Sequence, residues 1–95
     1  MAARSATTKN EFTYAAVTVP ATAGGIVIAA ANASRQVLRI ANVGSQTVYL
    51  GDASVATTTG YPLLAGAEYI DVASVTAVYG IVAGTTCEVR YLEIG

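Results

Sequence analysis

At 95 residues the chain is the size of one domain, and surface scaling leaves no room for a second core. Asp, Glu, Lys and Arg make up 12% of the residues, about half the usual share, whereas apolar residues reach 54%. A net charge of −1 argues against binding to nucleic-acid phosphates or to anionic membranes, and no apolar run approaches the ~20 residues that span a bilayer.

The first segment, residues 1–11, differs in character from everything after it. It holds Arg4, Lys9 and Glu11 among small polar residues, which predicts a flexible N-terminal arm ahead of one domain at 12–95. It also lacks the apolar stretch of a signal peptide, so we expect synthesis in a cytoplasm.

From residue 12 onward the composition is that of β-sheet. Val, Ile and Thr account for 30 residues of the whole chain, and turn residues recur at intervals of roughly 8–12 residues. No amphipathic helix is evident. We therefore predict an all-β fold, a single antiparallel β-sandwich or jelly-roll-like domain of seven or eight strands, about one per interval. The expected strands are 12–19, 26–30, 36–42, 47–51, 63–64, 68–72, 77–82 and 86–94.

Two loops and one glycine allow more specific predictions. Residues 52–60, DASVATTTG, form the longest irregular stretch and predict an exposed loop. Residues 83–85 predict a short hairpin loop in which Gly84 is available for positive φ. Gly80 lies inside a strand and predicts a bulge or a close backbone approach.

Alternation along the strands puts apolar residues on both faces. A sandwich normally exposes a polar face on each sheet, whereas here the second face is rich in Tyr and aliphatic residues. Although β-propensity alone accounts for a single Tyr, together they favour an interface. The predicted interface residues are Val37, Tyr49, Tyr69, Tyr79, Ile81, Leu92 and Ile94.

Residues with catalytic or metal-binding chemistry are scarce. The chain has no His, so its single Cys87 has no partner to activate it and is expected to be a structural core residue. The six acidic residues are scattered and predict solvated surface carboxylates, and the glycines show no phosphate-loop spacing. We predict a protein that is not an enzyme and binds no cofactor, metal ion or small-molecule substrate.

Residues 35–95 contain the phrases RQVLRIANVGSQTVYLGD, TTTGYPLLAGAEYIDV and AVYGIVAGTTCEVRYLEIG. This stretch resembles small β-rich virion structural proteins of tailed bacteriophages and prophages. The resemblance implies a structural role in the virion, first of all as a capsid decoration (cement) protein. It also implies a homo-oligomer, with a trimer expected, whose other partner is the major capsid protein.

Two alternatives remain open at this point. One is a different place in the virion, as a tail, neck or fibre-base component. The other is a carbohydrate-binding module in which the loop at 52–61 and its tyrosines meet a cell-surface glycan.

Overall fold

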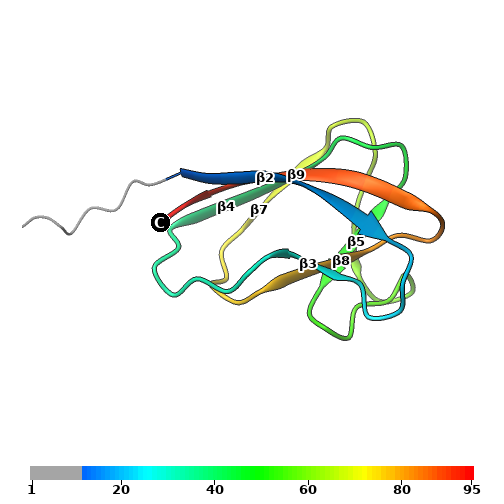
Figure 1. The fold of residues 1–95 in the computed structure, drawn as a ribbon, viewed down its shortest axis with the longest axis horizontal. Helices are drawn as coiled ribbons and strands as arrows, with labels where there is room; N and C mark the ends of the chain where they lie inside the picture. The colour runs from blue at the N-terminus through cyan, green and yellow to red at the C-terminus, as the bar shows by residue number, and fades with distance from the viewer. Residues whose placement is uncertain (1–11) are drawn as a thin grey trace, which may run out of the picture.

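The computed structural model describes residues 12–95, and every regular element in that range is a β-strand. The predicted arm at 1–11 lies outside the described residues. The strands form two four-stranded antiparallel sheets, a first sheet in the order β2-β9-β4-β7 and a second in the order β3-β8-β5-β6. They pack face to face as a sandwich (Figure 1). The bounds are β2 Phe12–Pro20, β3 Ile26–Ala29, β4 Val37–Asn42, β5 Val48–Gly51, β6 Tyr61–Leu63, β7 Tyr69–Val72, β8 Val78–Ile81 and β9 Thr86–Ile94.

The strand order is that of an eight-stranded jelly roll, in which most connections cross from one sheet to the other. Among the strands of residues 12–95, only β5 and β6 are consecutive and also paired. The predicted hairpin at 83–85 is therefore wrong, because β8 belongs to the second sheet and β9 to the first. This crossing needs a different backbone, and Thr85 rather than Gly84 takes the positive φ, at 51°.

The core lies between the sheets and follows from the alternation read in the sequence. Leu38 and Ile40 of β4 are fully buried, whereas Val37, which points to the outer face of the sheet, is 42% exposed. The same alternation buries Val48 of β5 and Val89 of β9. The cluster comprises Val19, Ile28, Ala29, Leu38, Ile40, Val48, Leu50, Leu63, Val78, Val82, Cys87 and Val89.

At Gly80 the space that a Cβ atom would take is filled by a core side chain, not by the approaching backbone that was expected. A Cβ atom at this position would lie 2.5 Å from Cδ1 of Ile28, inside any allowed contact distance. The neighbouring strand β3 changes register between Val27 and Ala29 beside it. Glycine here leaves room for the Ile28 side chain in the core, beside that irregularity.

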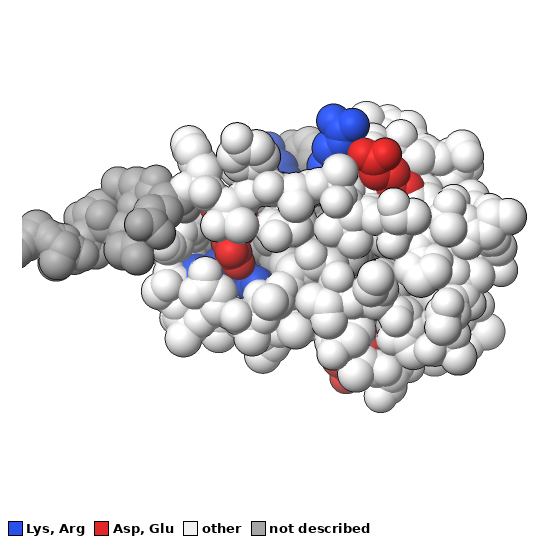
Figure 2. Space-filling model, in the orientation of Figure 1, with Lys and Arg blue, Asp and Glu red and all other residues white. Residues whose placement is uncertain are grey.

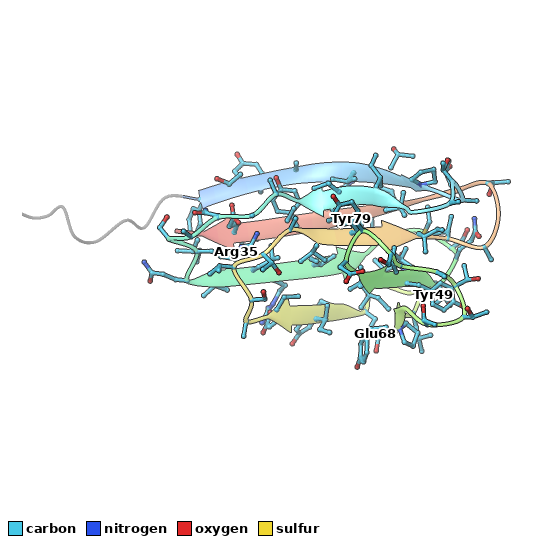
Figure 3. All side chains as sticks on the ribbon, turned by 90° about the horizontal axis from the view of Figure 1, so that it is seen from below. Arg35, Tyr49, Glu68 and Tyr79 are labelled. Atoms are coloured by element: carbon cyan, nitrogen blue, oxygen red, sulfur yellow. The ribbon has the colours of Figure 1, made fainter. Side chains whose placement is uncertain are left out.

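One end of the sandwich is closed by a buried ion pair that the sequence did not predict. Arg35 donates from Nε to Oε2 of Glu93 over 2.6 Å, and their side chains are 1% and 10% exposed. The same guanidinium donates to the carbonyl oxygens of Ala30, Ser74 and Thr76. Figure 3 labels Arg35. The expectation that all acidic residues are solvated is therefore wrong for Glu93. Its carboxylate is paired with Arg35, which is 58 positions away in the sequence.

Asn42, at the other end of β4, is likewise a buried polar residue that hydrogen-bonds main-chain groups of several segments. Its fully buried amide donates to the carbonyl oxygens of Gln46 and Leu63, and its oxygen accepts from the Gly44 N–H. Cys87 lies beside it, with Sγ 3.3 Å from that oxygen. Every polar atom of the Asn42 amide thus has a partner, as burial requires.

Candidate interaction surface

The outer face of the first sheet is assembled from four strands whose registers are known. Strand β2 pairs with β9 so that Phe12 lies beside Ile94 and Tyr14 beside Leu92. Strand β4 pairs with the other side of β9, which sets Val37 beside Ile94. We call these five residues the Phe12 patch: Phe12, Tyr14, Val37, Leu92 and Ile94.

The Phe12 patch is largely open to solvent. Phe12 and Tyr14 are 64% and 75% exposed, the highest values among the exposed large hydrophobic residues of the described chain. Val37 and Leu92 are exposed and Ile94 is half-buried. Charged residues make up 12% of the chain, and they leave most of the face drawn in Figure 2 uncharged. A contiguous apolar patch of this kind is a candidate interaction site on a folded domain.

The remainder of the same face carries paired charges. Arg39 donates from Nε and Nη2 to the two carboxylate oxygens of Asp71, over 2.7 and 3.0 Å. Its guanidinium carbon lies 4.1 Å from the ring centroid of Tyr69, in cation–π geometry. The outer face therefore divides into the apolar Phe12 patch and an ion-paired half that includes Tyr69.

The ion pair on this face shifts the pKa values of both Arg39 and Asp71. The hydrogen bond from Arg39 holds the pKa of Asp71 below its usual value, against the opposing effect of desolvation. The same hydrogen bond raises the pKa of Arg39. Both side chains are about half exposed, so the pair orients groups at the surface more than it stabilises the fold.

The outer face of the second sheet is covered in part by the chain itself, although Val27 of β3 stays 38% exposed. Loop 52–60 folds back across it, below β5 and β8 in Figure 1. Val55 from this loop is 5% exposed. It lies so close over Gly25, Gly51 and Gly60 that a Cβ atom on any of them would come within 3.1 Å of it. The loop was predicted to be exposed, and its polar residues are, but Val55 anchors it.

This cover changes the status of three predicted interface residues. Ile81 is only 6% exposed, so its prediction as a solvent-facing interface residue is wrong. It lines a pocket together with residues of segments 21–24 and 54–57. Tyr49 and Tyr79, which Figure 3 shows on the second sheet, are half-buried. The structure therefore brings Val37, Leu92 and Ile94 together on one face, separates Tyr69 from them, and puts Tyr49, Tyr79 and Ile81 on the other sheet.

Phe12 and Tyr14 are the interface candidates that sequence reasoning missed. The segment FTYAAVTV alternates, and this alternation places Phe12 and Tyr14 on one face of the first strand. The missing information was which strand lies next to it. Only the pairing of β2 with β9, from the opposite ends of the domain, joins them to Leu92 and Ile94.

Other candidate sites in the described chain are few. No group of three or more His, Cys, Asp or Glu residues within 12–95 is placed to hold a metal ion. No helix in this range could cross a membrane. A groove of about 300 Å³ opens between the two sheets, with Tyr61 and Asp52 on one side and Ile70 and Val72 on the other.

Comparisons with known proteins add no relative to this description. Neither the family models, nor the curated proteins, nor the solved structures contain a match to the chain.

Proposed function

We propose that this chain is a non-enzymatic structural protein of a tailed-bacteriophage virion, made in the host cytoplasm, that decorates the capsid as a homo-oligomer. The observation that carries the proposal is the Phe12 patch, an open apolar surface on a domain whose other outer face is covered in part by its own loop. Burying apolar surface contributes about 25 cal/mol per Å², so such a patch favours association with another protein surface.

The mechanism is mechanical. The domain docks on the major capsid protein, and many copies acting together hold the shell through individually weak contacts. The jelly roll is compatible with this role, since viral capsid domains use it, although lectin domains use it as well. The resemblance of residues 35–95 to virion proteins favours the capsid role and implies a trimer, whereas the Phe12 patch alone sets no symmetry.

A sedimentation experiment with undecorated capsids tests the proposal. We expect the purified protein to co-sediment with capsids and Val37→Asp, in the Phe12 patch, to weaken that binding. Val75→Asp is the matched control, because Val75 is also 42% exposed but lies outside the sheets. Equal loss in both variants, or no sedimentation of the unmodified protein, overturns capsid decoration. Binding to isolated tails instead supports the tail, neck or fibre-base position.

The groove between the sheets favours a second candidate, a carbohydrate-binding module. Tyr61 is 61% exposed at its mouth, where a sugar ring can stack on it, and Asp52, Ser74 and Thr76 supply polar groups. A glycan array tests this candidate. Retention of a glycan by the unmodified protein and its loss in Tyr61→Ala support the module, whereas no retention rules it out for the glycans displayed.

A further inference from the structure

Strand β2 is the edge of the first sheet, and the four sheet edges of the described chain differ in how they are protected. At the opposite edge β7 has only four residues and carries Asp71 in its ion pair. In the second sheet, β6 has three residues including Pro62, and β3 has four residues and a register shift. Short length, charge, proline and irregularity are the features that keep natural sheet edges from pairing.

None of these protections is present in β2 before its last residue. The strand runs for nine residues, FTYAAVTVP, with no charged side chain and with proline only at its end. Its pairing with β9 is regular from Phe12 to Pro20, without a bulge. Every residue from Phe12 to Ala16 is exposed. A long, regularly paired and uncharged edge of this kind is a template for another strand.

The hydrogen bonds of the sheet identify which β2 residues face the open edge. The Val43 N–H donates to the Glu88 carbonyl over 3.2 Å, which makes these two a hydrogen-bonded pair at the end of the β4–β9 ladder. Because such pairs alternate, even-numbered β9 residues bond to β4 and odd-numbered ones bond to β2. In the β2–β9 register the odd-numbered β9 residues pair with Thr13, Ala15, Val17 and Val19.

It follows that the even-numbered residues of β2 direct their backbone groups away from β9. The carbonyl of Pro20 agrees with this parity, since it accepts from the Val82 N–H on the far side. The residues that remain each present one N–H and one C=O to the open edge, without a partner among the described residues: Phe12, Tyr14, Ala16 and Thr18.

We propose that the open edge of β2 pairs with β2 of a second copy of this chain, antiparallel about a two-fold axis at Ala15. This register joins Phe12 to Thr18 and Tyr14 to Ala16 of the other copy, and it satisfies every open N–H and C=O of all four residues. It sets each large ring opposite a small side chain, and no charges oppose one another because the strand has none. The two first sheets become one continuous sheet.

The pairing is independent of the proposed virion function and has a consequence for it. In the two-fold dimer the two Phe12 patches lie on the same face of the continuous sheet, which doubles the apolar surface offered to a further partner. The trimer implied by the resemblance does not follow from this geometry, because a strand that pairs with itself closes after two copies.

The first test is the mass of the purified full-length chain, measured by light scattering from low to high micromolar concentration. We expect a dimer that dissociates on dilution. A trimer, or a monomer at high concentration, overturns the pairing. Either species that still sediments with capsids leaves the proposed function standing.

Proline substitution tests the edge itself. Ala16→Pro removes an N–H that faces the open edge but removes no hydrogen bond to β9. We therefore expect the variant to fold and to dimerise more weakly, with the Kd of the dimer raised about 10- to 100-fold or more. The matched control is Ala15→Pro, which removes an N–H bonded to β9 and is expected to lower the Tm at all concentrations. A dimer of unchanged Kd in folded Ala16→Pro overturns the pairing.

Hydrogen exchange in the unmodified protein covers the case in which neither variant folds. The amides of Tyr14, Ala16 and Thr18 are expected to become protected as concentration rises, while those of Ala15 and Val17 are protected throughout. A dimer in which the first three amides exchange at unprotected rates uses a different surface and overturns the pairing.

Discussion

Leu92 and Ile81 occupy comparable places in their strands, since each side chain points away from the core that lies between the two sheets. Leu92, on the first sheet, is 37% exposed beside Phe12 and Tyr14. Ile81, on the second sheet, is 6% exposed and lies in a pocket whose other lining residues come mostly from loop 52–60 and segment 21–24. Whether an outward apolar residue belongs to an interface or to a secondary core therefore depends on the connections, and the strand pattern carries no information about them.

The largest effect on stability is expected from breaking the buried ion pair between Arg35 and Glu93. Arg35→Met leaves the Glu93 carboxylate buried without its cation and frees the carbonyl oxygens that Arg35 bonds, so we expect the free energy of unfolding to fall by about 3–5 kcal/mol. Urea denaturation measures it. Arg39→Met is the matched control, because it breaks an ion pair on the open face and is expected to have only a small effect. Equal losses in the two variants would contradict the distinction between closed and open regions.

A direct comparison of the two outer faces comes next in size. Ile81→Ala creates a cavity in a closed site and should lower the free energy of unfolding by about 2–5 kcal/mol. Leu92→Ala removes side-chain atoms that are partly in solvent, and in a monomeric sample we expect a loss below about 1 kcal/mol. Thermal denaturation at low protein concentration measures both. If Leu92→Ala costs as much as Ile81→Ala, the first sheet's outer face is not open in solution.

The sequence predicts the strands well and the spatial relations between them poorly, for a physical reason. Alternation and turn residues are local, so the strand predicted at 36–42 agrees closely with β4 at Val37–Asn42. Glu93 shows the limit, because its burial depends on Arg35, which a crossing connection brings beside it. The same holds for the candidate surface, since Phe12 and Leu92 become neighbours only through strand pairing. One unread local signal was Val55, a lone large apolar residue in an otherwise small and polar loop.

The smallest expected effect concerns the pH dependence of the ion pair on the open face. Asp71 has its folded-state pKa below the unfolded value of 3.8, so its contribution to stability is present above that pH and is lost as the pH falls through the folded value. We therefore expect the stability difference between the unmodified protein and Asp71→Asn to shrink on acidification below about pH 4. Urea denaturation at neutral and acid pH measures this difference, and added salt should reduce it as well, since the pair is exposed. The control repeats Asp71→Asn in an Arg39→Gln background, where the cation that depresses the pKa is absent and the pH dependence of the difference should largely disappear. A difference that persists unchanged in acid would mean that Asp71 contributes through its shape or its neighbours and not through its charge.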